Sequence, residues 1–205
     1  MPDRAEHWET LYVTKHADTV SWYQPAPAPS LDAQARITPA KSKGLIDVGG
    51  GASNLVDALL ERGWRDLAVL DIAQPALDVA RARLGERADD VEWIAADITT
   101  WRPERRYAIW HDRAVFHFLT EAADRAGYRA ALEQGLAPGG ALLMATFALG
   151  GPERCSGLSI VQYGPESLSA ELGEAFSLQD SWREDHVTPG GGVQAFNRCL
   201  FRKTG

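Results

Sequence analysis

The sequence of 205 residues has few cysteines, no long apolar run and no excess of basic residues. Its two cysteines, Cys155 and Cys199, lie far apart in the chain, which argues against a disulfide framework and against a zinc module. The longest apolar stretch, residues 141–149, has about half the length that a membrane-spanning helix needs. Charged side chains interrupt the first twenty residues, so we expect no signal peptide and no membrane association.

The charge balance is acidic, with 28 Asp and Glu against 21 Lys and Arg and a formal net charge of −7. A nucleic-acid-binding protein usually presents a basic face, so nucleic acid is not an expected partner. The arginines at 102, 105 and 106 form one basic cluster, which we interpret as solvated surface. The hydrophobic fraction of 45% is typical of a globular chain, and we expect one cytoplasmic domain spanning residues 1–205, as a monomer or homodimer.

From residue 44 onward, short apolar segments alternate with amphipathic ones. This alternation is typical of βαβ units and predicts an α/β fold with a parallel sheet that is covered by helices on both faces. The predicted strands are residues 44–48, 67–70, 91–95, 107–110 and 141–147, and the predicted helices are residues 53–63, 74–87 and 120–136. Residues 44–148 thus form the first predicted part of the domain, a run of strand–helix units.

The pattern changes after residue 147. A predicted helix over 165–172 is followed by strand-like segments at 176–183 and 193–201, joined only by a short Pro- and Gly-rich loop. Because a parallel crossover needs a longer connection, the two segments predict an antiparallel hairpin. Residues 149–205 therefore form the second predicted part, a helix followed by a C-terminal hairpin.

Residues 1–30 combine aromatic side chains with a Pro-rich stretch. Trp8, Tyr12 and Trp22 precede the sequence QPAPAPS at 24–30, which we interpret as a linker. An aromatic segment on a linker predicts a flap that closes over a site. The alternative is an N-terminal arm that packs on the domain without a role in the site.

Three predicted strands end at an acidic residue, at Asp47, Asp71 and Asp97. In open parallel sheets, ligands bind beyond the carboxyl ends of the strands. Glycines after the first strand, including Gly49 and Gly51, allow the backbone to turn tightly and approach a ligand, and the start of the following helix favours a carboxylate. These features predict a ligand site at this edge.

The two later acids indicate an adenosine pocket without a large phosphate. Asp71 is placed to accept hydrogen bonds from two ribose hydroxyls, and Asp97 to accept one from an adenine amino group beside the amide of Ile98. A dinucleotide site is the alternative, because Gly49-x-Gly51 begins a G-x-G-x-x-G match. Asn54 occupies its third glycine position, and no Tyr-x-x-x-Lys pair of a short-chain oxidoreductase follows the fourth strand.

These motifs in this order resemble the class I, seven-strand S-adenosylmethionine-dependent methyltransferases. Residues 46–53 (IDVGGGAS) are similar to the first motif of that family, and residues 71–72 and 96–98 to its second and third. Residues 111–117 (HDRAVFH) occupy the fourth motif, and residues 136–140 (LAPGG) resemble its lead into the fifth strand. The resemblance covers about residues 44 to 202.

The resemblance implies a three-layer α/β/α Rossmann-like fold with strand order 3-2-1-4-5-7-6, in which the last inserted strand is antiparallel. It implies the cofactor S-adenosylmethionine and the product S-adenosylhomocysteine. The cofactor-binding residues are then Asp47, Gly49, Gly51, Asp71, Ile72, Asp97, Ile98, Asp112, Tyr12 and Trp22. The N-terminal segment is similar to the flap of the citrate synthase lysine methyltransferase subgroup, although the chain departs from that subgroup around Asp112.

The acceptor is expected to be a small molecule or a single side chain. A protein lysine is one alternative, and a non-catalytic adenosine-binding domain or an NAD-dependent oxidoreductase is another. Methyl transfer from a sulfonium needs alignment rather than a serine or cysteine nucleophile, so Cys155 has no predicted role. We expect no metal site, because Asp112 lacks a cluster of neighbouring ligands. The predicted substrate residues are Arg113, Tyr163, His186 and Gln194, with His117 as the base or an orienting group.

Overall fold

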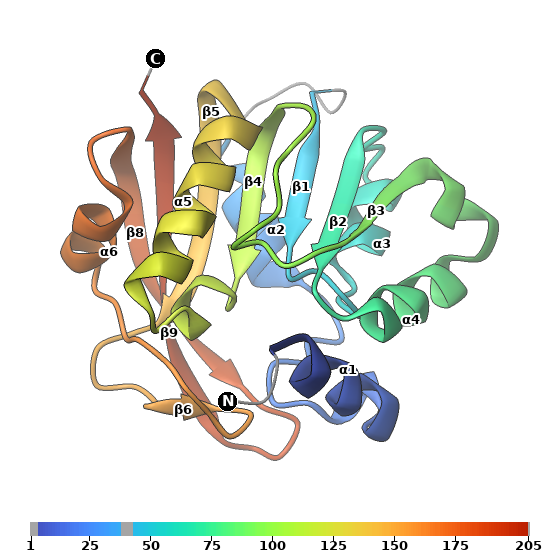
Figure 1. Cartoon of the computed structure of the whole chain (residues 1–205). Helices are drawn as coiled ribbons and strands as arrows, with labels where there is room; N and C mark the ends of the chain where they lie inside the picture. Colours follow the sequence, from blue (N-terminus) through green and yellow to red (C-terminus); the bar gives the residue numbers. More distant parts are fainter. Residues whose placement is uncertain (1–3, 38–42, 205) are drawn as a thin grey trace.

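The computed structural model describes residues 4–37 and 43–204, and its centre is a seven-stranded sheet (Figure 1). The strand order is β3-β2-β1-β4-β5-β9-β8, and β9 runs antiparallel to both of its neighbours. β6 and β7 form a separate small hairpin, so β8 and β9 are the sixth and seventh strands of the large sheet in chain order. The strand order is therefore the predicted 3-2-1-4-5-7-6, which is confirmed. The strands of the large sheet are β1 (Leu45–Val48), β2 (Leu67–Asp71), β3 (Val91–Ala95), β4 (Tyr107–Arg113), β5 (Leu136–Phe147), β8 (Phe176–Val187) and β9 (Val193–Lys203).

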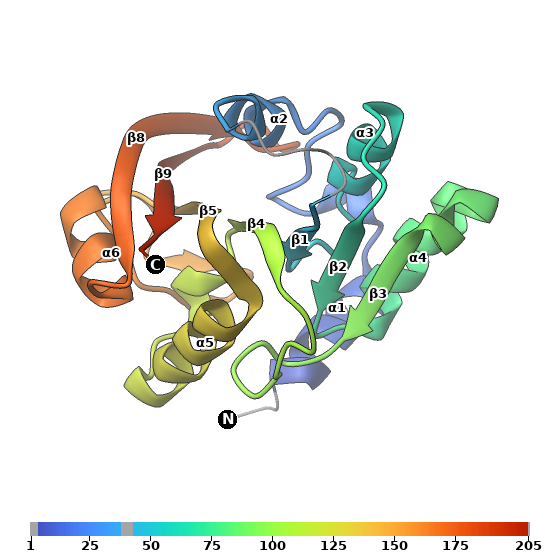
Figure 2. The same cartoon turned by 90° about the horizontal axis from the view of Figure 1, so that it is seen from above.

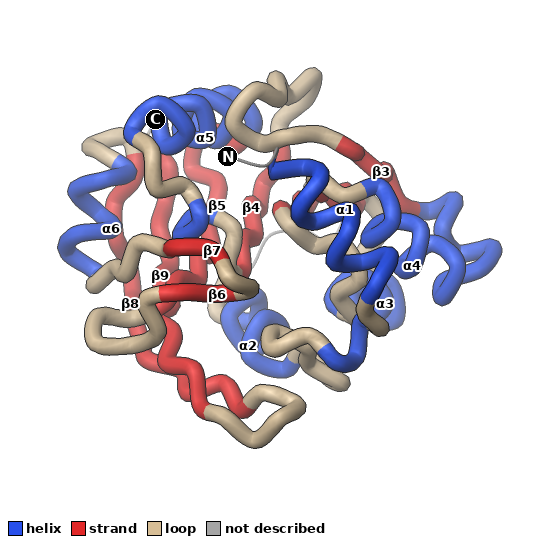
Figure 3. The backbone as a smooth tube through the Cα atoms, turned by 60° about the horizontal axis from the view of Figure 1, so that its bottom comes forward, coloured by secondary structure: helices blue, strands red, loops and turns tan. Residues whose placement is uncertain are grey.

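Helices cover both faces of the sheet, which confirms the three-layer architecture (Figure 2). One face carries α2 (Ala28–Ala35), α3 (Leu55–Glu61) and α4 (Gln74–Leu84), and the other carries α5 (Ala122–Gly135) and α6 (Pro165–Leu172). α1 (Arg4–Thr14) belongs to neither layer and lies across the carboxyl ends of the strands (Figure 3). The small hairpin of β6 (Arg154–Cys155) and β7 (Leu158–Ser159) lies at the same end.

Successive side chains of the buried strands pack alternately against the helices on the two faces of the sheet. Leu45 of β1 packs into the cluster under α2, α3 and α4, whereas Ile46 and Val48 pack into the cluster under α5 and α6. Successive side chains of a strand point to opposite faces, and both faces here are covered. Apart from polar residues near their carboxyl ends, the sequences of the central strands are therefore apolar.

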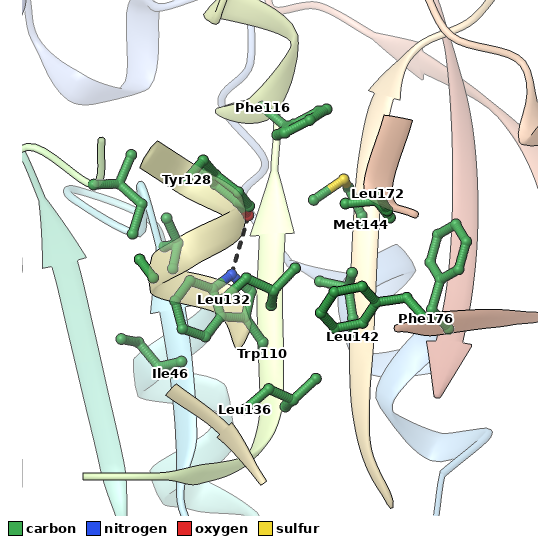
Figure 4. Packing of buried hydrophobic residues seen from close by; sticks show 14 of the residues in the cluster. Ile46, Trp110, Phe116, Tyr128, Leu132, Leu136, Leu142, Met144, Leu172 and Phe176 are labelled. Atoms are coloured by element: carbon green, nitrogen blue, oxygen red, sulfur yellow. Dashed lines mark hydrogen bonds between the residues drawn. The ribbon is translucent and has the colours of Figure 1, made fainter. Parts of the chain in front are cut away.

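The larger cluster is built around two aromatic residues beneath α5 (Figure 4). Trp110 of β4 and Tyr128 of α5 are fully buried, and the indole Nε1 of Trp110 donates a hydrogen bond of 3.0 Å to the Tyr128 hydroxyl. Leu132 and Leu142 pack into the same cluster. The hydrogen bond satisfies two polar groups that would otherwise be costly to bury.

Several element boundaries differ from the predicted ones. β4 continues past Trp110 to Arg113, because His111 and Arg113 pair with Leu143 and Ala145 of β5. β5 begins at Leu136, and β8 extends to Val187. The predicted helix over 74–87 ends at Leu84, because Gly85 has a φ of +59° and a 3-10 helix (Gly85–Asp90) follows. Pairing and turn geometry decided these limits.

Within the described residues 4–37 and 43–204, no helix has the length and apolar character needed to cross a bilayer.

Candidate functional site

The carboxyl ends of β1, β2, β3 and β4 open into a cavity whose space, counted out into the open solvent at its mouth, is about 820 Å³. Its walls come from the loops after these strands, from the N-terminal arm (residues 4–23), and from the ends of β5 and β9. A second cavity, of about 590 Å³ counted in the same way, lies on the α2 side, and the two share Tyr12, Trp22, Gly49 and Arg113.

The glycine loop has a shape that side chains would prevent. Gly49 and Gly51 have φ angles of +69° and +28°. A Cβ atom at Gly49 would lie 2.1 Å from the side chain of Val115, and one at Gly51 would lie 2.5 Å from Oδ2 of Asp71. Gly49 lines both cavities, and Gly51 lies directly against Asp71. The loop thus brings bare backbone to the cavity edge, as a bound cofactor requires.

Asp47 lies beneath this loop rather than in the larger cavity. A Cβ atom at Gly50 would lie 2.6 Å from Oδ2 of Asp47, and the carboxylate lines the second cavity. Oδ1 of Asp47 is 2.7 Å from Nδ1 of His111, and Nε2 of His111 is 3.0 Å from Oγ of Ser30. This chain of three buried side chains connects β1, β4 and α2 and orients Asp47 under the loop.

Asp71 lines the larger cavity at the end of β2. Its Oδ1 accepts a hydrogen bond of 2.9 Å from the amide of Ala73, and it forms no ion pair with any described residue. Burial raises the pKa of Asp71 to about 7, and the nearby Asp47 carboxylate adds to the rise. A buried carboxylate without a cation is suited to accept hydrogen bonds from neutral hydroxyls, which fits a ribose.

The adenine side of the predicted site is assembled next to Asp71. Ile72, Asp97 and Ile98 all line the larger cavity. Oδ1 of Asp97 accepts hydrogen bonds of 2.9 and 2.7 Å from the amide and hydroxyl of Thr99, which orient the carboxylate. Ile72 and Ile98 add apolar surface to the same cavity, which suits a planar base. The residues present therefore fit an adenosine moiety.

Asp112 occupies a different place from the one predicted. It is fully buried, does not line either cavity, and accepts hydrogen bonds from the Tyr128 hydroxyl at 2.6 Å and from the amides of Val115 and Phe116 at 2.9 and 3.2 Å. These bonds hold the turn after β4, where Ala114 has a φ of +74°. Because its acceptor positions are taken inside the protein, Asp112 shapes the site instead of contacting a cofactor.

The N-terminal arm closes the larger cavity with aromatic rings. Trp8, Tyr12 and Trp22 line it, and the ring of Trp8 lies edge-on at 5.7 Å from Trp22 and 5.1 Å from Phe118. Arg4 ties α1 to the loop after β3 and to α5 through ion pairs with Asp97 and Asp124. The stretch predicted to be a linker over 24–30 runs into α2, which begins at Ala28.

His117 does not line the cavity, and its position does not support the predicted role as general base. The ring is fully buried, and its Nδ1 accepts a hydrogen bond of 3.1 Å from the amide of Phe147. Burial, reinforced by the charge of Arg113, lowers the pKa of His117 to about 3. A neutral imidazole whose acceptor nitrogen is occupied has no site left to take a proton.

The predicted substrate residues divide into two pairs. Arg113 and Gln194 line the larger cavity. Tyr163 is buried outside its lining, with its ring 5.5 Å from that of Phe116, and His186 donates a hydrogen bond of 2.8 Å from Nε2 to the carbonyl of Ser21. Tyr163 thus belongs to the core, and His186 anchors the arm.

Sequence reasoning missed several residues of the cavity wall. Phe118, Phe147 and Phe196 supply aromatic surface beside Trp8 of the predicted flap, and Cys155, for which no role was predicted, lines the same space. Phe147 ends β5, which is a position where a site residue is expected in a parallel sheet. The remaining residues lie outside any motif. Burial raises the pKa of the Cys155 thiol, so the group is protonated and apolar in character.

A seven-stranded sheet of this order, with a glycine loop after β1 and an acid at the end of β2, defines the S-adenosylmethionine-dependent methyltransferase fold. Residues 45–140 match the family model described as a methyltransferase domain. These residues are just under half of the chain, and over them it resembles the class I S-adenosylmethionine-dependent methyltransferases.

Three relatives illustrate the similarity. The trans-aconitate 2-methyltransferase of Rhizobium leguminosarum bv. trifolii (strain WSM2304) is 30% identical over 115 residues, which are 56% of this chain but 42% of that protein. The chain therefore spans less than half the length of this curated relative.

Two solved structures share the fold. An S-adenosylmethionine-dependent methyltransferase from Anabaena variabilis has a TM-score of 0.78 at 14% identity, covering 99% and 96% of the two chains. The 1,6-didemethyltoxoflavin-N1-methyltransferase of Burkholderia thailandensis has a TM-score of 0.72 at 21% identity, covering 98% and 89%.

Proposed function

We propose that this protein transfers a methyl group from S-adenosylmethionine to a small-molecule acceptor. The observation that carries the proposal is a single cavity that joins Asp71 and the glycine loop to an aromatic space beyond the end of β4. The first part fits an adenosine cofactor, and the second leaves room for an acceptor. Both the trans-aconitate and the toxoflavin relatives are named for small-molecule acceptors.

The residues assigned to the cofactor follow from the lining. Asp71 accepts hydrogen bonds from the ribose hydroxyls, and Asp97 with Ile98 holds the adenine. The loop containing Gly49 and Gly51 supports the amino-acid end. When bound, the cofactor supplies a methyl group on a sulfonium, which is a leaving group that needs no further activation.

The protein then contributes alignment and water exclusion rather than proton transfer. His117 holds the backbone of Phe147, and Asp112 holds the turn after β4, so neither reaches the cavity. The aromatic side chains of Trp8, Trp22 and Phe118 cover the cavity. Holding reactants in line in a site closed to water is a sufficient source of rate for such a displacement.

The arm bears on the choice between a small acceptor and a protein lysine. Ring contacts among Trp8, Trp22 and Phe118, and the hydrogen bond from Arg113 to the Trp22 carbonyl, keep it packed over the cavity. A small molecule can be enclosed by such a cover, whereas a lysine of a folded protein must pass through it. We propose a cytoplasmic enzyme with one domain, as a monomer or homodimer.

Two measurements test this function. Calorimetry should show that S-adenosylhomocysteine binds and that NAD does not, and NAD binding without S-adenosylhomocysteine binding would refute the proposal. Radiolabelled methyl groups from S-adenosylmethionine should then enter the small-molecule fraction of a cell lysate. Labelling of the protein fraction alone would favour the lysine methyltransferase alternative.

A further inference from the structure

Arg113 is the charged side chain shared by the two cavities. Its Nη1 donates a hydrogen bond of 2.8 Å to the carbonyl of Trp22. Its Nε and Nη2 are buried and have no hydrogen-bond partner among the described residues. Nε and Nη2 share one edge of the guanidinium plane, and that edge binds a carboxylate through two parallel hydrogen bonds.

The protein itself does not neutralise this charge. Glu184 and Asp47 are the carboxylates that act on Arg113 electrostatically, but Glu184 forms an ion pair with Arg198, and Asp47 is hydrogen-bonded to His111. Burial, together with the positive charge of Arg198, lowers the pKa of Arg113 to about 10, so the group remains charged at neutral pH. A buried charge without a counterion is costly unless a ligand completes the pair.

The neighbours of Arg113 in the cavity are mostly apolar. Its Cζ lies 5.4 Å from the ring centre of Phe196, and Phe147 and Cys155 line the same space. Gln194 adds one more unused polar atom, since its Oε1 is buried without a partner among the described residues. A few convergent polar groups in an apolar cavity fix the orientation of a ligand. Here they select an anionic group beside a hydrogen-bond donor.

We propose that the methyl acceptor is a small carboxylic acid whose carboxylate is bound by Arg113 and whose hydrogen-bond donor faces Gln194. This inference rests on the proposed function and names the substrate class of the same site. The carboxylate of the cofactor is the other source of this chemistry. The acceptor is favoured because the guanidinium packs against Phe196 of β9, on the side of the cavity away from β1. Arg113 also shares both cavities with Gly49 of the glycine loop, so the third measurement tests the cofactor carboxylate directly.

The first test needs no variant. Calorimetry on the protein saturated with S-adenosylhomocysteine compares matched pairs: benzoate with benzamide, 4-hydroxybenzoate with 4-hydroxybenzamide, and succinate with succinamide. The acid should bind at least about tenfold more tightly than its amide in one or more pairs, because a charge-assisted bidentate contact is lost in the amide. If S-adenosylhomocysteine binds but no acid is preferred, this inference fails and the proposed function stands. If S-adenosylhomocysteine itself does not bind, the proposed function fails.

The second test assigns the preference to Arg113. In Arg113→Gln the acid should lose its tighter binding relative to the amide. Arg113→Lys retains the positive charge but not the two parallel N–H donors of the guanidinium, so it should keep part of the preference for the acid. Arg65→Gln is the matched control, because Arg65 is exposed just before β2, at the opposite end of the sheet. An acid preference that persists in a folded Arg113→Gln protein overturns the inference.

A third measurement separates the two sources of carboxylate. S-adenosylhomocysteine carries an amino-acid carboxylate, and 5′-methylthioadenosine lacks it. Arg113→Gln should leave the affinity ratio of these two nucleosides unchanged. If Arg113→Gln weakens the binding of S-adenosylhomocysteine about tenfold but leaves the binding of 5′-methylthioadenosine unchanged, Arg113 binds the carboxylate of the cofactor, and the inference about the acceptor is overturned.

Discussion

The two sides of the larger cavity are built in different ways. The cofactor side consists of Gly49, Asp71, Ile72, Asp97 and Ile98, which lie within one continuous run of βαβ units. The acceptor side brings together the ends of β4, β5 and β9, the β6–β7 hairpin and the N-terminal arm, which are dispersed over the whole chain. The cofactor side is built from strand ends and a glycine turn, so it can be recognised from short sequence motifs. The acceptor side is built by the packing of side chains that are far apart in the chain, so no short motif reveals it.

The largest expected effect tests the cofactor side. Asp71→Asn removes the charge that accepts the ribose hydroxyls, so the affinity for S-adenosylhomocysteine should fall by roughly 1.5–3 kcal/mol. The same variant should raise the unfolding midpoint of the unliganded protein at pH 8, because it removes a buried carboxylate whose pKa is raised. Calorimetry and thermal unfolding measure the two effects.

Asp78→Asn is the matched control, since Asp78 is exposed on α4 and lies outside the cavity lining. It should change neither quantity. If Asp71→Asn binds S-adenosylhomocysteine with unchanged affinity, Asp71 does not bind the ribose. The cavity side that contains Asp71 could then no longer be assigned to the cofactor.

The next effect is a pH dependence of the same side. The pKa of Asp71 is raised from 3.8 to about 7 in the unliganded protein, and hydroxyl donors favour the ionised form. Affinity for S-adenosylhomocysteine should therefore fall as pH drops below about 7, approaching tenfold per pH unit, and level off above it. The sign for stability is the reverse. This group makes the unliganded protein less stable as pH rises from 3.8 to about 7. Both slopes should be absent in Asp71→Asn.

A smaller effect concerns the connection between α2 and the sheet. Ser30→Ala removes the hydroxyl that contacts His111, and the buried imidazole nitrogen then lacks a partner. The free energy of unfolding should fall by about 1–2 kcal/mol, as denaturant titration would show. Ser181→Ala on β8, where the side chain is exposed, serves as the control. Equal stability of the two variants would show that Ser30 contributes nothing to holding α2.

The smallest effect is a change in protection of the arm. Residues 4–23 close the cavity through ring contacts, so their amides should exchange more slowly when S-adenosylhomocysteine is bound, while β1, already covered on both faces, should not change. Hydrogen exchange with and without the ligand measures this. Identical exchange of the arm in both states would make it a static part of the wall.

The sequence predicted the α/β architecture well because strand burial is a local property. The segments that became β1 and β2 are apolar except for Asp47 and the terminal Asp71, and a strand buried on both faces must be largely apolar. The prediction failed at β4, which was expected to stop before His111. His111, Asp112 and Arg113 are polar, yet pairing with β5 keeps them in the strand, and long-range pairing of this kind leaves no local signal.

The sequence by itself determined the alternation of strands and helices, the glycine loop and the acids that follow the strands. Each of these depends on backbone geometry or on burial within a few residues. Only the tertiary structure decided that Asp112 and His117 are enclosed while Arg113 and Gln194 reach the cavity. Neighbouring residues on one turn have similar local surroundings in the sequence. Their exposure depends on which distant elements pack over them, here α5, β5, β9 and the arm.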